Sequence, residues 1–545
     1  MEVLPTIPVP GPACSASPAA TEPCPVCPRL AAEFAPWQQA AYWKSLHQRA
    51  VQREQSLRQE NQTLRARLRD LEQRLFGRRT EAVAVLAEAD PSPPPSAPSR
   101  PRGQQRGRPG PKRRDHSHLP AVEEIIDLPS DQQHCSQCGQ AFVSFPGTED
   151  STVLEVEVRA HRRLIRRRRY RPACRCGCNP GVVAAPPPPK VLPKSTLGVS
   201  IWVTVLLDKY LFYRPTYRLL ADLATQGLDL SLGTTTDGLR RLLPLLQPLY
   251  DALVERSRAQ TLWHADETRW LVYASVEGKV GYRWFLWVFH ASDVVVFVLA
   301  GGRGHDVPEE HLGPLAEGVL VVDRHAAYKA LPQVKDGRIV LAFCWAHVRR
   351  DFLEAARAWP TLRDWALGWV ERIGALYRVN DARRGVRDDP AAFAEADRAL
   401  REQIVVLARQ AEIELQEDGL HTARRKTLES LQTHWPGLTV FVEHPQVPMD
   451  NNTAERAQRG PVVGRKNYYG SGAEWSGRLA AVLFSLLQTL ALANLNPRLW
   501  LTAYLEGCAA AGGRAPTDAT AYLPWNLTDE QKRAWQYPSS PPNTS

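Results

Sequence analysis

Between residues 261 and 343, short runs rich in β-branched and aromatic residues follow one another, separated by polar or glycine-containing stretches. Runs of this length and composition are typical of β-strands. The predicted strands are residues 261–274, 281–290, 293–299, 318–322 and 338–343.

The segments on either side of these runs have the apolar spacing of helices. Helices are predicted over residues 200–213, 216–225 and 234–256, over the charged stretch 364–432, and over the apolar stretch 479–505. Pro244 and Pro248 fall inside the third of these helices and predict a kink there. The mixture of strands and helices predicts an α/β core with additional helical parts.

Three acidic residues hold related positions in this pattern. Asp266 lies on the first predicted strand, Asp323 ends the fourth, and Glu455 lies in the first turn of a later helix that Asn452 can cap. This order of carboxylates suggests a ribonuclease-H-like sheet, in which the three side chains would meet at one point.

A cluster of three carboxylates is suited to a divalent cation. Mg²⁺, or Mn²⁺ in its place, takes oxygen ligands, and two such ions on one phosphodiester promote in-line phosphoryl transfer. Each acid also has an ordinary explanation. An Asp at a strand end is commonly a turn residue, and Glu455 could serve only as the capping-box partner of Asn452.

The sequence motifs around these acids resemble those of a known family. His264-Ala-Asp266-Glu-Thr, Cys344-Trp-Ala-His347-Val-Arg349-Arg350 and Asn451-Asn452-x-x-Glu455-Arg456, followed by Arg465-Lys466-Asn467, are similar to the insertion sequence 66 family of bacterial transposases. The resemblance is to its large catalytic subunit, a DDE-type enzyme, and extends from about Leu57 to Trp525.

The resemblance implies an enzyme that binds terminal inverted repeats, cleaves DNA by hydrolysis and joins the freed 3′ hydroxyls to target DNA. Asp266, Asp323 and Glu455 would hold two metal ions, and the helical insertion at about 360–440 would shape the DNA channel. Two other functions stay open: an inactive zinc-containing DNA-binding protein or repressor derived from a transposase, and a nuclease without joining activity. Arg324-His325 departs from the family, in which small or aromatic residues more often follow the second Asp.

Net charge places DNA among the expected partners. The 545-residue chain carries a formal charge of +10, but two segments together carry more than this total. Ser99–Arg114 has seven Lys/Arg and Arg159–Arg171 has eight, with no acid in either. Positive charge concentrated in this way favours a polyanion partner. Predicted contacts to DNA or its phosphates involve Arg106, Arg108, Arg166, Arg167, Arg168, His347, Arg349, Arg350, Arg456, Arg459, Arg465 and Lys466.

Two of these basic regions allow more than one role. Arg106-Gly-Arg108 resembles a hook that enters an A·T-rich minor groove, but a tether with non-specific phosphate contacts would have the same composition. Arg240 and Arg241 lie on the second helix of a possible helix-turn-helix, although helices that only pack together would look the same.

Leucines at heptad spacing precede the basic linker. Leu57, Leu64 and Leu71 share one heptad position, and Asn61 resembles the buried polar residue that sets register in dimeric zippers. We expect self-association as a dimer or higher assembly, while a helix that packs on its own domain remains the alternative. The family usually encodes two small accessory proteins, which are further expected partners.

A small cysteine module follows the linker. Cys135 and Cys138 form a knuckle, and Cys174 with Cys176 or Cys178 would complete a tetrahedral structural Zn²⁺ site. Strands are predicted between the cysteines over residues 152–159 and 162–170, the second strongly basic.

No secretory signal or membrane-length apolar span is evident, so a cytoplasmic, nucleoid-associated protein without a membrane partner is expected. The predicted order of parts is a disordered N-terminus at 1–36, a coiled coil at 37–80, a basic linker at 81–120, a zinc-binding module at 121–190, a helical DNA-binding segment at 191–258, the ribonuclease-H-like catalytic core at 259–475 and C-terminal helices with a tail at 476–545.

Overall fold

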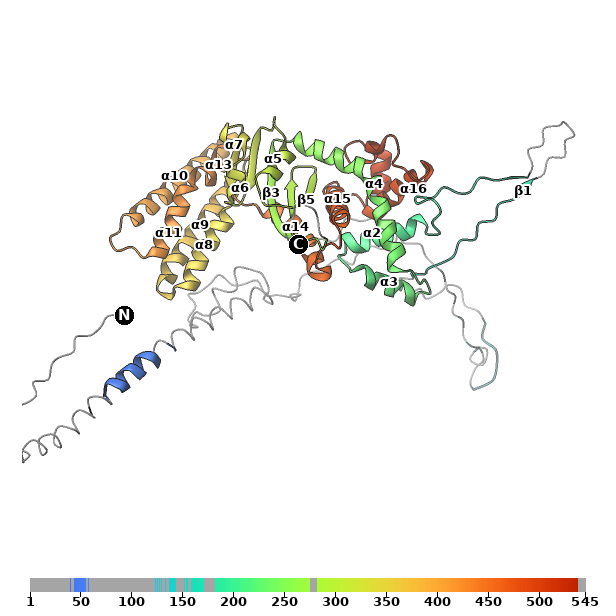
Figure 1. Cartoon of the computed structure of the whole chain (residues 1–545), viewed down its shortest axis with the longest axis horizontal. Coiled ribbons are helices and arrows are strands. Elements are labelled where there is room, and N and C mark those ends of the chain that lie inside the picture. Colours follow the sequence, from blue (N-terminus) through green and yellow to red (C-terminus); the bar gives the residue numbers. More distant parts are fainter. Residues whose placement is uncertain are drawn as a thin grey trace, which may run out of the picture. The chain divides into compact units, whose positions relative to one another are not determined.

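The computed structural model describes residues 158–170, 182–274 and 282–537 continuously, together with scattered residues between 40 and 154 (Figure 1). Residues 44–54 are helical, as predicted, and their part in a coiled coil stays a prediction. Several predictions concern residues outside the described part of the chain: the remaining zipper positions Asn61, Leu64 and Leu71, the linker arginines Arg106 and Arg108, and the zinc ligands Cys135, Cys174, Cys176 and Cys178. Contacts divide the chain into two compact units, Met1–Ser117 and His118–Ser545.

The second unit contains a mixed sheet of five strands in the order β5-β4-β3-β6-β7. Their bounds are β3 Leu262–Leu271, β4 Arg283–His290, β5 Val295–Ala300, β6 Gly318–Val322 and β7 Ile339–Phe343. β3, β4 and β5 pair antiparallel, whereas β6 runs parallel to both β3 and β7. All five predicted strands are therefore confirmed. A separate two-stranded pair is formed by β1 Arg169–Tyr170 and β2 Val183–Ala184.

Helices surround the sheet. Before and between the strands are α2 Val199–Tyr210, α3 Thr216–Thr225, α4 Leu232–Arg258, α5 Asp306–Leu312, α6 Ala326–Lys329 and α7 Pro332–Lys335. After β7 are α8 Trp345–Ala358, α9 Arg363–Gly385, α10 Pro390–Leu415, α11 Thr422–Thr433, α12 Trp435–Leu438, α13 Val440–Glu443, α14 Asn452–Tyr468, α15 Glu474–Leu492, α16 Pro497–Ala510 and α17 Asp529–Trp535.

Helices cover the sheet, and its hydrophobic side chains are buried beneath them. α4 and α15 pack on β5, and α14 packs on β3 and β4, while α7, α12 and α13 contact β7. Helices α8 to α11 pack on one another as a bundle after the last strand (Figure 1). This bundle corresponds to the helical stretch that the sequence predicts between the second and third carboxylates.

Helix α15 completes the edge of the sheet. Ser485 Oγ accepts a hydrogen bond from the Phe297 backbone N–H at 2.7 Å, and Thr489 Oγ1 accepts one from Val295 N–H at 3.0 Å. These contacts satisfy backbone groups of edge strand β5 that would otherwise be unpaired. Among the described residues, α15 is the helix with the length and apolar composition to cross a membrane. It is mostly buried against β5 and α4 here, as predicted for a core helix.

Some local predictions are wrong. Among the described residues of the predicted strand 162–170, only Arg169–Tyr170 is paired as a strand, and none of the described residues of 152–159 is. Helix α4, by contrast, continues through Pro244 and Pro248 as predicted, and the kink at these prolines stays a prediction. Leu246, Leu249 and Leu253 are fully buried in it, so its C-terminal half belongs to the core, and packing rather than local backbone preference determines its length.

Two buried histidines, His264 and His311, and the partly buried His290 should make the protein sensitive to acid. Burial lowers the pKa of His311 to about 3 and the pKa values of His264 and His290 to about 4. Their unfolded pKa is near 6.5, so below that pH the unfolded chain binds protons that the folded chain does not. Stability should therefore be lost as pH falls from 6.5 through about 4, on the order of several kcal/mol in total. Thermal denaturation between pH 4 and 8 measures this loss. His311→Gln should make the dependence on pH shallower, and an unchanged slope would contradict the assignment.

Candidate functional site

The parallel pairing of β3 and β6 places two of the three acidic residues on adjacent strands. The recorded register pairs Leu262 with Val319 and His264 with Val321. Continuing it by two residues sets Asp266 beside Asp323, on the same face because side chains alternate with a period of two.

Gly318 makes this close pairing possible. Its φ is +141°, and a Cβ at this position would lie 2.0 Å from the carbonyl oxygen of Thr261. Only glycine adopts such a conformation without strain and leaves room for the neighbouring backbone. The glycine at the start of β6 therefore allows the strand that ends at Asp323 to enter the sheet beside β3.

The third acid comes from α14, which packs on β3, the strand of Asp266, and on β4. Gln458 Nε2 donates to the backbone carbonyls of Asp266 at 3.2 Å and Leu286 at 3.1 Å. Glu455 precedes Gln458 by three residues and therefore lies on the same face of the helix. Like Gln458, the buried Asn451 connects this helix to β3: its Nδ2 donates to the Ala265 carbonyl at 2.7 Å.

The electrostatics of Asp266 reflect this convergence. Burial is the main cause that raises the pKa of its carboxyl to about 8, followed by the charge of Glu267 and then by those of Glu455 and Asp323. The structure thus brings the three predicted residues close enough for their charges to interact. A partly buried group of carboxylates is stabilised by a cation or by protonation.

The helix containing Glu455 does not start as predicted. α14 begins at Asn452, its N-cap residue is Asn451, and neither side chain caps the helix. Asn451 is instead buried and directed into the fold, where its Oδ1 contacts His264 Nδ1 at 3.2 Å and its backbone N–H donates to Cys344 Sγ at 3.2 Å. The capping-box interpretation of Asn452 and Glu455 is therefore wrong, because Asn451 is the N-cap residue and its side chain makes tertiary contacts instead of capping the helix.

His347 lies beside the third acid. Its Nε2 is 3.9 Å from Glu455 Oε1, and one ligand atom from each of Cys344, His347 and Glu455 falls within 4.8 Å of the others. Burial raises the pKa of the Cys344 thiol to about 11 and lowers the pKa of His347. Cys344 is therefore a protonated packing residue, as expected, whereas the neutral imidazole of His347 faces the carboxylates.

A fourth carboxylate, Glu267, was not predicted as a site residue. Its side chain is 1% exposed, forms an ion pair with Arg303, and accepts a hydrogen bond from Tyr328 Oη at 2.7 Å. Its position directly after Asp266, on a strand with alternating faces, was the available signal in the sequence. Because Arg303 and Tyr328 occupy its two oxygens, Glu267 is committed to contacts within the protein.

The unusual pair after Asp323 does not enter the carboxylate cluster. Arg324 forms an ion pair with Asp351 at 2.6 Å and donates to Ser430 Oγ at 3.0 Å, so its guanidinium binds α8 and α11. The backbone N–H of His325 donates to Asp323 Oδ1 at 2.9 Å, and its ring accepts from Ala327 N–H. His325 thus caps α6 and helps to orient Asp323.

Arg324→Ala should therefore reduce stability. The Arg324–Asp351 pair is partly buried, so its loss should cost about 1–2 kcal/mol of unfolding free energy. Chemical denaturation measures the loss, and an unchanged free energy of unfolding would contradict the role of this ion pair.

The predicted phosphate-contacting residues are found in different environments. Arg456, Arg459 and Lys466 are exposed on α14, whereas Arg465 donates to Thr268 Oγ1 at 3.0 Å and to the Arg269 carbonyl. Arg349 and Arg350 are partly buried on α8. Arg166, Arg167 and Arg168 are exposed in an extended segment, where Arg167 donates to the Ala185 carbonyl at 3.0 Å. The described residues therefore offer several exposed cations on the helix of the third acid.

Comparison with known proteins identifies the family of the chain. The family model described as "Transposase IS66 family" matches residues 194–479, more than half of the chain. Among curated proteins of Sinorhizobium fredii, "Uncharacterized protein y4jD" is 29% identical over 76% of this chain and 81% of its own length. "Uncharacterized protein y4qI" from the same organism is 28% identical over 77% of this chain and 78% of its own. The matched region contains β3, β6 and α14 with their acidic residues, and the chain belongs to the IS66 family of transposases.

Proposed function

We propose that the chain is an active DDE transposase with a ribonuclease-H-like core that binds the inverted repeats of its element, cleaves DNA and transfers the freed strand. The observation that carries the proposal is the parallel pairing of β3 with β6, because it sets Asp266 beside Asp323 under the helix of Glu455. Three antiparallel strands followed by two parallel ones, in this order, also support the ribonuclease-H-like assignment.

Family membership implies DNA as a partner and the use of divalent metal. The proposal adds that Asp266, Asp323 and Glu455 hold Mg²⁺ or Mn²⁺. Their carboxylate oxygens fit such ions, and the raised pKa of Asp266 reflects a site that favours added positive charge. The Cys344, His347 and Glu455 group fits less well because its thiol is buried and protonated. Two ions bound at the carboxylates supply activation of the attacking oxygen and stabilisation of the leaving oxygen.

The chain's own residues have distinct roles in this proposal. Asp266, Asp323 and Glu455 hold the charge, Asn451 and Gln458 anchor α14 to β3, and the exposed Arg456 and Arg459 contact the DNA phosphates. Water is the nucleophile for cleavage, and the resulting 3′ hydroxyl is the nucleophile for joining. Each step breaks one phosphodiester bond, and no covalent bond to the protein forms.

The other predicted parts belong to the same proposal. The heptad segment before the linker would bring two or more chains together, and the cysteine module would hold structural Zn²⁺. The basic linker, the exposed Arg166–Arg168 segment and the exposed Arg240 and Arg241 on α4 would contact DNA outside the catalytic centre.

The test is an assay of the full chain on duplexes that carry the repeats flanking its reading frame, together with target DNA. With Mg²⁺ or Mn²⁺ we expect cleaved 3′ ends and joined products; with EDTA we expect binding alone. Cleavage without joining in the presence of target DNA would assign a nuclease. Binding without cleavage in any divalent metal would assign a DNA-binding protein or repressor, and would overturn the catalytic proposal.

A further inference from the structure

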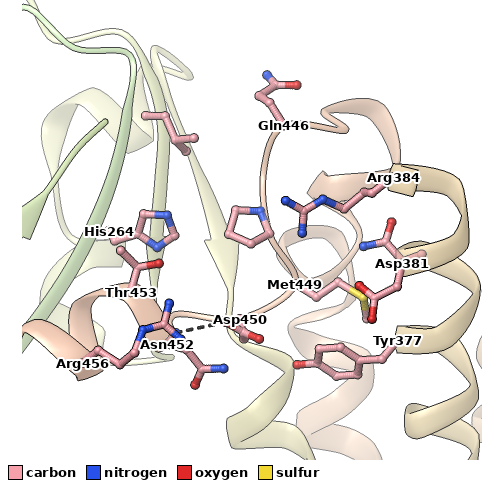
Figure 2. Close-up of a pocket in the computed structure, with 13 residues that line it drawn as sticks. His264, Tyr377, Asp381, Arg384, Gln446, Met449, Asp450, Asn452, Thr453 and Arg456 are labelled. Atoms are coloured by element: carbon pink, nitrogen blue, oxygen red, sulfur yellow. Dashed lines mark hydrogen bonds between the residues drawn. The ribbon is translucent and has the colours of Figure 1, made fainter. Parts of the chain in front are cut away.

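A cavity of about 480 Å³ lies between α9 and the start of α14, outside the carboxylate cluster. Figure 2 shows Tyr377, Asp381 and Arg384 on one side of it, and His264 and Arg456 on the other. Its volume is within the range of pockets that enclose small organic ligands. None of the α9 residues belongs to the motifs that identify the site in the sequence.

The cavity adjoins the proposed catalytic centre through two elements. His264 precedes Asp266 by two residues on the same face of β3, which is about 7 Å along a strand. Arg456 directly follows Glu455 on α14. A DNA strand with its reacting phosphate at the carboxylates would therefore have a neighbouring nucleotide within reach of this cavity.

The charges that line the cavity do not favour an anion inside it. The carboxylates of Asp381 and Asp450 balance the guanidiniums of Arg384 and Arg456. Neither arginine forms an ion pair with another residue in the described part of the chain. A neutral polar ligand suits such a lining better than a phosphate would, while the two arginines can contact phosphates at its edge.

Hydrogen-bonding capacity in the wall is left unused. Asn380 is only 2% exposed, lines the cavity, and its Oδ1 has no hydrogen-bond partner. A buried acceptor of this kind is costly unless a donor reaches it. On the opposite wall, Asn451 Oδ1 lies 3.2 Å from His264 Nδ1, so that contact is already made within the protein. The ligand should therefore present a hydrogen-bond donor to Asn380 Oδ1.

We propose that this cavity takes one unpaired base of the DNA strand next to the cleavage site, turned out of the helix; the inference rests on the proposed function. A base with an exocyclic amine, which is adenine, cytosine or guanine, supplies the donor that Asn380 Oδ1 lacks. Tyr377 provides an aromatic face, and Arg456 lies between the base and the reacting phosphate. Extruded bases are bound elsewhere by this combination of polar edge contacts and stacking.

The experiment compares two single strands with equal numbers of phosphates: an octamer of deoxycytidine and an abasic octamer. Binding to the full chain is measured by fluorescence anisotropy in EDTA, so that no catalysis occurs. The native chain should prefer the cytidine strand about tenfold, because stacking and edge contacts to a base supply affinity that phosphates cannot. Asn380→Leu and Tyr377→Leu should each reduce this preference to about twofold or less, whereas Tyr377→Phe, which keeps the ring, should retain most of it.

Arg378→Ala is the matched control. Arg378 is exposed on α9 but does not line the cavity. Its loss should weaken the binding of both DNA strands alike and leave the tenfold ratio of their affinities unchanged. Circular dichroism and thermal denaturation verify the folding of each variant. Equal binding of the two strands by the native chain, or an unchanged ratio in both leucine variants, would overturn the inference. A chain that discriminates bases but never cleaves DNA would contradict the proposed function alone, and one that cleaves and joins without discriminating would contradict only the cavity.

Discussion

Asp266→Asn is expected to reduce DNA cleavage and strand transfer by about a thousandfold or more, and at the same time to stabilise the metal-free protein. The loss of activity follows because the amide cannot replace a carboxylate as a charged ligand. Binding to repeat DNA should persist, since the exposed cations that contact phosphates are unchanged. Gel-shift and strand-transfer assays on the same preparation measure the two properties separately.

The gain in stability follows from the raised pKa of Asp266. Its folded value of about 8 lies above the unfolded value near 3.8, so folding favours the protonated form. The cost of ionising it in the folded protein is absent below pH 3.8, grows as pH rises and is complete above about pH 8. In EDTA at pH 9, Asp266→Asn should therefore raise the free energy of unfolding by an amount on the order of a few kcal/mol.

Glu506→Gln is a suitable control for this variant. Glu506 is exposed on α16, and its substitution makes the same change in charge away from the cluster. It should alter neither activity nor the stability of the metal-free protein. Retained strand transfer in Asp266→Asn, or a stability at pH 9 equal to that of the control, would show that Asp266 is not part of a metal-holding carboxylate cluster.

Arg383→Met is expected to destabilise the helical bundle by about 3–5 kcal/mol. Arg383 is fully buried on α9, where it donates to Asp397 at 2.7 Å and to the backbone carbonyls of Phe441 at 2.7 Å and Val442 at 3.1 Å. Methionine fills similar space but leaves two buried carbonyls without a donor. Asp397 keeps its contact with Arg401, which limits the loss on that side.

Chemical denaturation measures this effect, with Arg398→Met as the control. Arg398 is exposed on α10, and the same substitution there should change stability by less than about 0.5 kcal/mol. Arg383→Lys should be intermediate, because lysine keeps the charge but cannot reach both carbonyls and the carboxylate. A loss in Arg383→Met no greater than in the control would contradict the role of this arginine in joining α9 to α10 and α13.

Much of the fold can be predicted from local patterns. The strand at residues 318–322 and the helix at 216–225 were predicted with the bounds that the structure has, because β-branched composition and helical spacing operate over a few residues. The prediction of paired strands between residues 152 and 170 was largely wrong for the described residues. Local alternation there was not matched by a partner strand or a buried face.

For the candidate site, too, some features could be predicted from the sequence and others could not. Sequence order and residue type were sufficient to nominate Asp266, Asp323 and Glu455, whose roles stay predictions, and the family model covers the region that contains them. The same information could not show that Asn451 faces inward, that Arg324 binds Asp351, or that Glu267 is shielded by Arg303 and Tyr328. Each of these outcomes depends on a partner far away along the chain.

By itself, the sequence determined the elements, the carboxylates and the concentration of positive charge, since these follow from short-range spacing and composition. Only the tertiary structure decided which polar groups are already paired and which, such as Asn380 Oδ1, remain unpaired at a cavity. The physical reason is that burial and hydrogen bonding depend on neighbours in space, and parallel pairing of β3 with β6 joins residues that lie more than fifty positions apart.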